Sequence, residues 1–224
     1  MKFVEYPDRD MMMIDVADKL ASELNAALMT HDAVSLAVPG GTTPGPVFDT
    51  LSVVDLDWSR VTVMLTDERW VPESSDRSNT RLLRERLLQD RAAAARLLPF
   101  YTGASEPEDA LESLDEAISA ELPLSVLLLG MGADMHTASL FPGADRLEDA
   151  LAHDAPHLLP MRAPGAPEPR LTLTVPVLRG AMSKHVLITG ANKRAALERA
   201  AKLDDPMEAP VCAVLNDATV HWAE

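Results

Sequence analysis

The run VLLLG at residues 126–130 most constrains what this chain can fold into. A strand that is apolar at every position has to be buried on both of its faces. Apolar residues at helical spacing precede it, over residues 106–122, and predict a helix. A helix followed by such a strand is typical of a parallel sheet that helices cover on both sides.

The same alternation runs along the rest of the chain. Helices are predicted over residues 12–28, after Pro44, from Ser78 or Asn79 through Leu88, and over 192–202. Strands are predicted over residues 34–38, 61–66, 171–175, 185–190 and 212–216. The Pro-rich segment 153–169 interrupts the pattern, as a long connection or a small subdomain. We therefore expect one α/β domain over residues 1–224, with a mainly parallel central sheet.

Charge and composition narrow the function. The 35 acidic and 20 basic residues give a net charge of −15, which disfavours nucleic acid and anionic lipid as partners. Cys212 is the only cysteine, so no intrachain disulfide can form, and a reducing compartment fits. The first ten residues carry charges where a signal peptide needs an apolar core, and no apolar run approaches the ~20 residues that span a bilayer. We expect a cytoplasmic protein.

Three turn segments follow predicted strands: PGGTTPG (39–45), TDERWVP (66–72) and GMGADMHTASLFPG (130–143). In parallel α/β sheets, ligands bind at the carboxyl ends of the strands. Because each segment begins where a predicted strand ends, we expect the three to meet in space and to form a binding site.

The first segment combines backbone N–H groups, hydroxyls and the start of a helix, which suits a phosphate. Its residues are Gly40, Gly41, Thr42 and Thr43. It lacks the Gly-Lys-Ser/Thr ending of a Walker loop, and GMGADM (130–135) does not complete a dinucleotide fingerprint, since Met135 stands where a glycine is needed. An ordinary strand-to-helix turn remains the alternative.

The other two segments carry the candidate catalytic groups. Asp67, Glu68 and Arg69 end a buried strand, where charges must be paired or must face a cleft. A structural ion pair is the alternative to a binding role. His136 is the candidate general base, because a neutral imidazole can accept a proton at pH 7, and Asp134 could hold its ring. A histidine that caps a helix is the other interpretation.

Two further cations stand near strand ends. Lys193 begins a predicted helix, where a positive charge is misplaced unless it serves an anion, and Arg170 precedes the strand at 171–175. Both could instead be solvated surface residues. His153 and His157 are four residues apart, but no third ligand accompanies them, so we expect no metal site.

Several motifs together resemble a known family. GGTTP, LTDERWVP with Ser78-Asn79 beyond it, LLLGMGADMHTASLFPG, RLTLT and GANK occur in the order typical of 6-phosphogluconolactonases. The likeness spans roughly residues 35–200. It implies a Rossmann-like three-layer α/β sandwich, similar to the sugar-phosphate isomerases and deaminases. It also implies hydrolysis of 6-phosphogluconolactone to 6-phosphogluconate, in the pentose phosphate pathway, without a metal or other cofactor.

The resemblance implies roles for single residues. His136 resembles the catalytic base and Asp134 its neighbour in the motif, while Arg69 would contact the lactone end or the phosphate. The implied substrate and phosphate positions are Gly40, Gly41, Thr42, Thr43, Asp67, Arg170 and Lys193. Neither the cation that holds the phosphate nor the oligomeric state follows from the sequence.

This chain departs from the family pattern at two positions. Met135 replaces the usual glycine between Asp134 and His136, and Ser125 replaces an aspartate before the apolar run. If position 135 needs a positive φ, Met135 strains the turn; otherwise it adds bulk to the pocket wall. A glucosamine-6-phosphate deaminase-like enzyme remains an alternative, although ASLFP after His136 argues against it. A sugar-phosphate sensor without catalysis is a further alternative.

Overall fold

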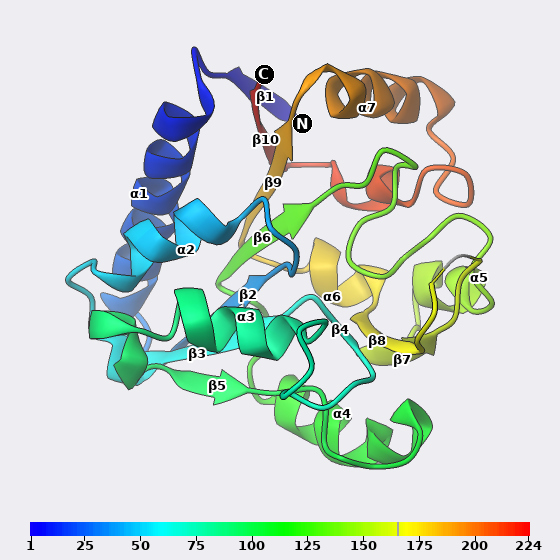
Figure 1. Ribbon diagram of the computed structural model, residues 1–224, viewed down its shortest axis with the longest axis horizontal. Helices are drawn as coiled ribbons and strands as arrows, with labels where there is room; N and C mark the ends of the chain where they lie inside the picture. Colours follow the sequence, from blue (N-terminus) through cyan, green and yellow to red (C-terminus); the bar gives the residue numbers. More distant parts are fainter. Residues whose placement is uncertain (165) are drawn as a thin grey trace.

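The structure is a computed structural model that describes residues 1–164 and 166–224. Its centre is a seven-stranded sheet in the order β1-β10-β9-β6-β2-β3-β5 (Figure 1). Every pair of neighbouring strands in it runs parallel. The strands are β1 (Lys2–Glu5), β10 (Thr219–Ala223), β9 (Ser183–Thr189), β6 (Val126–Gly130), β2 (Val34–Val38), β3 (Val61–Leu65) and β5 (Arg96–Leu98).

A small antiparallel sheet lies beside the large one, in the order β4-β8-β7. Its strands are β4 (Asp67–Arg69), β8 (Arg170–Leu173) and β7 (Leu158–Met161). The helices are α1 (Arg9–Leu28), α2 (Gly45–Ser52), α3 (Asn79–Arg86), α4 (Leu111–Ser119), α5 (Leu147–Leu151), α6 (Val175–Arg179) and α7 (Ala191–Leu203). Figure 1 shows α1 and α2 to the left of the large sheet, and α6, α7 and the small sheet to its right. The predicted α/β fold with a mainly parallel sheet is confirmed.

The local signals that predicted the elements are visible in the structure. Every residue of β2 and β3 is buried, as their continuous apolar sequences require. Helix α1 starts earlier than predicted, at Arg9, because the Asp8 carboxylate accepts a hydrogen bond from the Met11 backbone N–H at 2.8 Å. Ser78 caps α3 in the same way, through the Arg81 N–H at 3.2 Å.

Two predicted strands need correction. Residues 212–216 form no strand; a 3-10 helix, η4 (Pro210–Val214), covers most of them, and the last strand is β10. This 3-10 helix begins at Pro210, and a proline has no N–H group to donate to a neighbouring strand. The apolar run is therefore buried in a short helical turn and not in the sheet. Residues 171–175 do contain a strand, but it is β8 of the small sheet, where the Pro-rich segment supplies its partner β7.

Two predicted helices are shorter than their apolar patterns. The segment 106–122 begins as a 3-10 helix, η3 (Pro107–Ala110), and continues as α4 only to Ser119. Helix α3 ends at Arg86, so Leu87 and Leu88 lie beyond it. Apolar residues after a helix end still pack into the core, which is why spacing alone extended both helices too far. The two remaining 3-10 helices are η1 (Trp58–Arg60) and η2 (Asp90–Ala94).

A buried polar layer fastens α1 to β9 and β10. His185 Nδ1 and His221 Nε2 are 2.9 Å apart, and both rings are buried. His185 Nε2 lies 2.8 Å from Glu23 Oε2, and His221 Nδ1 lies 2.8 Å from the Tyr6 hydroxyl. The Tyr6 hydroxyl donates a hydrogen bond to Asp15. No sequence pattern marked these histidines, because their partners are far away along the chain.

Acid should loosen this layer. Burial, together with the charge of His185, lowers the pKa of His221 to about 4, so the folded state favours the neutral ring. A folded-state pKa below the unfolded value of about 6.5 contributes stability that is present above pH 6.5 and lost as the pH falls toward 4. Between pH 7 and pH 5 we expect wild type to lose about 2 kcal/mol more unfolding free energy than His221→Gln, as measured by urea denaturation.

The exposed His153 provides the control, because His153→Gln should follow the wild-type pH dependence. If the wild type and His221→Gln lost the same free energy between pH 7 and pH 5, His221 would not be the group that senses acid.

Candidate active site

The three turn segments meet at the carboxyl ends of β2, β3 and β6, as predicted, and border a cleft of about 210 Å³. The lining residues are Pro39, Gly40, Gly41, Thr43, Pro44, Asp67, Arg69, Asn79, Gly130, Met131, Gly132, His136, Ala138, Arg170, Leu187 and Lys193. Two of the expected site residues are not among them. Thr42 is exposed in the first segment, and Asp134 contacts the cleft through His136.

His136 and Asp134 form a hydrogen-bonded pair on the loop after β6. The Nδ1 atom of His136 lies 2.6 Å from Asp134 Oδ1, and the hydrogen bond from His136 lowers the pKa of Asp134. An ionised carboxylate can only accept, so Nδ1 carries a proton, and Nε2 has a free lone pair whenever the ring is neutral. A Cβ atom at Gly132 would overlap both side chains, so this position needs a glycine. The geometry suits a general base.

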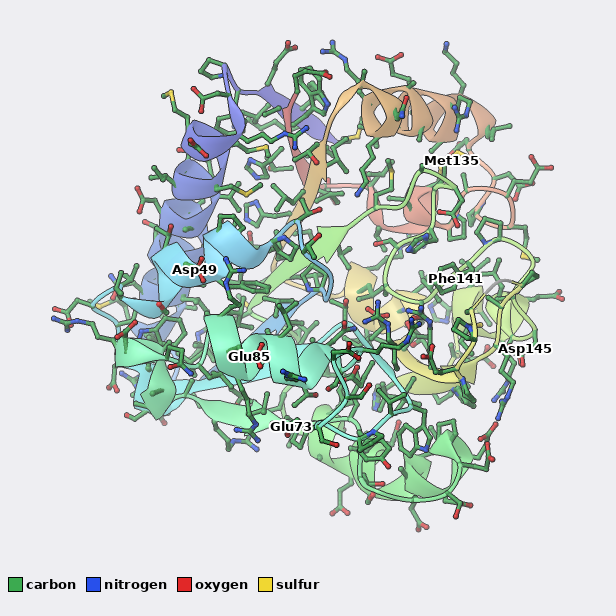
Figure 2. All side chains as sticks on the ribbon, in the orientation of Figure 1. Asp49, Glu73, Glu85, Met135, Phe141 and Asp145 are labelled. Atoms are coloured by element: carbon green, nitrogen blue, oxygen red, sulfur yellow. The ribbon has the colours of Figure 1, made fainter. Side chains whose placement is uncertain are left out.

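An aromatic ring links His136 to Arg170. The ring centroids of His136 and Phe141 are 4.3 Å apart, and the Arg170 guanidinium carbon lies 5.1 Å from the Phe141 centroid. Figure 2 shows Phe141 on the same loop as Met135, nearer the small sheet. The stack holds Arg170 on the side of the cleft where His136 lies. Phe141 belongs to the motif LLLGMGADMHTASLFPG, but nothing in the sequence indicated its contact with His136.

The buried Asp67 orients Arg170. Its Oδ2 atom lies 3.6 Å from Arg170 Nη1 and accepts a hydrogen bond from the Ser139 hydroxyl at 2.5 Å. Burial lowers the pKa of Arg170, yet a guanidinium stays charged at any physiological pH. Asp67 therefore lines the cleft as a partner of Arg170, and since a carboxylate repels phosphate, a direct contact of Asp67 with a phosphate is disfavoured.

Lys193 and the first turn segment lie at the start of helices. Lys193 is in the first turn of α7, partly buried, and burial lowers its pKa. Among the described residues it makes no hydrogen bond or ion pair. Gly41 has a φ of +84°, which its lack of a side chain permits, and the segment leads into α2. Backbone N–H groups and a free ammonium in one cleft are well suited to an anion.

Arg69 completes the set of cations. Its Nη1 atom donates to the Arg77 carbonyl at 2.6 Å and to Asn79 Oδ1 at 3.3 Å. Its buried Nε finds no partner among the described residues, and neither does the Nε of Arg170. Despite the net charge of −15, the cleft therefore has three basic side chains, Arg69, Arg170 and Lys193, and unused donors.

In residues 1–164 and 166–224, no group of three His, Cys, Asp or Glu side chains could hold a metal ion. No helix within the same residues has the length and apolar character needed to cross a membrane.

Met135 occupies one of two positions of the loop at which a residue other than glycine has a positive φ; the other is Ala138. The φ of Met135 is +68°, so the turn does demand the left-handed conformation, which costs a residue with a side chain roughly 1–2 kcal/mol. Its N–H donates to the Gly132 carbonyl at 3.0 Å, and its carbonyl accepts from the Val211 N–H at 3.1 Å. Figure 2 shows Met135 on the loop below α7. These backbone bonds hold the turn that carries His136.

The fold and the cleft define an α/β protein with three cations beside a histidine–carboxylate pair. The family model described as glucosamine-6-phosphate isomerases/6-phosphogluconolactonase matches residues 7–222, and the chain belongs to this family. A protein of Rhizobium meliloti named 6-phosphogluconolactonase is 44% identical over 93% of this chain and 92% of its own. One from Pseudomonas aeruginosa with the same name is 42% identical over 92% and 88%.

Solved structures agree with this assignment. The crystal structure of a 6-phosphogluconolactonase from Shewanella baltica matches with a TM-score of 0.96 and 34% identity, over 100% of this chain and 98% of that one. A monomeric glucosamine-6-phosphate deaminase matches with a TM-score of 0.81 at 16% identity, which shows a shared fold alone.

Substitutions at Met135 should reveal the strain. Met135→Gly relieves it but frees the unfolded chain and removes packing, so we expect the unfolding free energy to change by less than about 1 kcal/mol, with activity retained. Met135→Val should lose at least about 1 kcal/mol, because β-branched residues tolerate a positive φ poorly. Urea denaturation measures both. Equal stability of the Val and Met proteins would show that the turn does not require a positive φ.

Proposed function

We propose that this protein hydrolyses 6-phospho-D-glucono-1,5-lactone to 6-phosphogluconate. The observation that carries the proposal is a histidine, held by a carboxylate through Nδ1, in a cleft with three cations. A lactone with a phosphate needs both: a base that activates water and positive charge that binds an anion. The relatives named 6-phosphogluconolactonase, at 42–44% identity, support the same substrate.

In this proposal the phosphate lies against Lys193 and the N–H groups of residues 40–43. Lys193 is the cation without a protein partner among the described residues, and it shares the cleft with the Gly40-Gly41 turn. Arg170 is stacked on Phe141 beside His136, so it belongs to the lactone end together with Arg69. This arrangement separates the group that anchors the substrate from the groups that act on its carbonyl.

The proposed reaction uses His136, Asp134, Arg69 and one water molecule. The Nε2 atom of His136 takes a proton from a water molecule, whose oxygen attacks the lactone carbonyl carbon. The carbonyl oxygen becomes an oxyanion, which the Arg69 guanidinium stabilises. When the tetrahedral intermediate collapses, the bond from the carbonyl carbon to the ring oxygen breaks, and the His136 imidazolium protonates that oxygen. Asp134 stabilises the imidazolium through Nδ1.

Replacing His136 tests the proposal. His136→Ala should lower kcat by ~10²–10⁴-fold, the typical contribution of general acid–base catalysis, without loss of the fold. The measurement is acid release from fresh lactone, corrected for its spontaneous hydrolysis. His153→Ala, which removes an exposed histidine, is the matched control and should match the wild type. Near-wild-type turnover by His136→Ala would exclude His136 as the base.

The lactone assay on the wild-type protein, together with measurements of 6-phosphogluconate binding and of ammonia release, separates the alternatives. A sugar-phosphate sensor would bind 6-phosphogluconate without accelerating the loss of lactone. A deaminase-like enzyme would release ammonia from glucosamine 6-phosphate. Binding without accelerated lactone loss, or ammonia release without it, would overturn the proposed activity.

The phosphate assignment has its own test. Lys193→Met should raise KM for the phosphorylated lactone by roughly 10–100-fold, the value of a charge-assisted hydrogen bond, and should leave hydrolysis of unphosphorylated glucono-1,5-lactone nearly unchanged. Lys202→Met, at an exposed lysine in the last turn of the same helix, is the control. An equal loss on both substrates would place Lys193 away from the phosphate.

A further inference from the structure

The side chain of Asn79 joins three segments of the cleft wall. It is 3% exposed, at the start of α3. Its Nδ2 atom donates to the Asp67 carbonyl at 3.0 Å, and its Oδ1 accepts from Arg69 Nη1 at 3.3 Å. A Cβ atom at Gly40 would overlap the Asn79 amide group, so this amide also packs directly against the Gly40-Gly41 turn. One amide group thus contacts the turn that follows β2 and the strand β4, which follows β3.

The backbone of Asn79 is held independently of this amide. Glu68 is fully buried, and its carboxylate accepts from the N–H groups of Arg69, Asn79 and Thr80 at 2.8, 2.9 and 2.7 Å. The hydroxyls of Ser78 and Thr80 donate to it as well, at 3.2 and 2.8 Å. Ser78 remains the cap of α3. The helix start should therefore survive a change of the Asn79 side chain, which makes the side chain testable by itself.

We propose that Asn79 is a positioning residue for the reaction: it holds the Arg69 guanidinium toward the lactone carbonyl. The inference rests on the proposed function. The Asn79 amide supplies a donor to the Asp67 carbonyl and an acceptor to Arg69 at the same time. A carboxylate at this position would face the Asp67 carbonyl with a second acceptor and would neutralise the charge that Arg69 offers to the oxyanion. A neutral amide orients Arg69 and leaves its charge available.

The kinetic signature follows from this role. Because Arg69 would act on the oxyanion, which exists only after attack, displacing it lowers kcat and leaves KM nearly unchanged. We expect kcat to fall ~10–100-fold in Asn79→Ala, the cost of misplacing a reacting group by about 1 Å. Asn79→Asp should also lose activity although it has the same shape. Asn25→Ala, at an exposed asparagine of α1, is the control.

A double-mutant cycle tests whether Asn79 acts through Arg69. In the Arg69→Ala background, Asn79→Ala should cause little further loss of kcat, because its target is gone. Multiplicative losses would overturn the inference, and so would a wild-type kcat in Asn79→Ala. A wild-type protein without lactonase activity would instead overturn the proposed function, and the inference with it. The two failures are therefore distinguishable.

A second cycle tests the contact with Gly40 through stability, without substrate. Gly40→Ala should lower Tm by about 5 °C, because the added methyl group overlaps the Asn79 amide. In the Asn79→Ala background the same substitution should cost much less. An equal loss of Tm in both backgrounds would show that the Asn79 amide is not seated against the Gly40 turn, and it would contradict the proposed geometry.

Discussion

The parallel register of β2, β3 and β6 is the constraint on which the rest of the structure depends. Parallel pairing aligns the carboxyl ends of these strands, so the segments after Val38, Leu65 and Gly130 emerge at one edge. The register is fixed because these strands are buried on both faces, and a slip would move each side chain to the opposite face and disrupt its packing. The loops can therefore carry glycines, charges and a strained methionine, because the sheet and not the loops holds their ends together.

Electrostatics then separates the cleft from the rest of the surface. An acidic chain repels anions in general, but Arg69, Arg170 and Lys193 border one small cleft. Two of the three are directed by partners: Asp67 lies beside Arg170, and Asn79 accepts from Arg69. Lys193 has no such partner among the described residues. In our account this difference matches their roles, since an anchoring cation needs freedom to meet a phosphate and a catalytic cation needs a fixed direction.

Particular elements show what the sequence could predict. The apolar runs of β2, β3 and β6 and the stripe of α1 were predictable because burial dictates them locally. The strands β1, β4, β5 and β7 were not, since nothing in their short sequences distinguishes them from loops, and the apolar run at 212–216 predicted the last strand in place of β10. Convergence of the turn segments followed from parallel topology. The amide contacts of Asn79 and the stacking of Phe141 on His136 depend on tertiary packing, and the positive φ of Met135 depends on its turn.

The most direct test of the account is a crystal structure of the protein with bound 6-phosphogluconate. We expect the product carboxylate within hydrogen-bond distance of His136 and Arg69, and the phosphate against Lys193 and the N–H groups of residues 40–43. A product bound in the opposite direction, with its phosphate at Arg69 and its carboxylate at Lys193, would contradict the account.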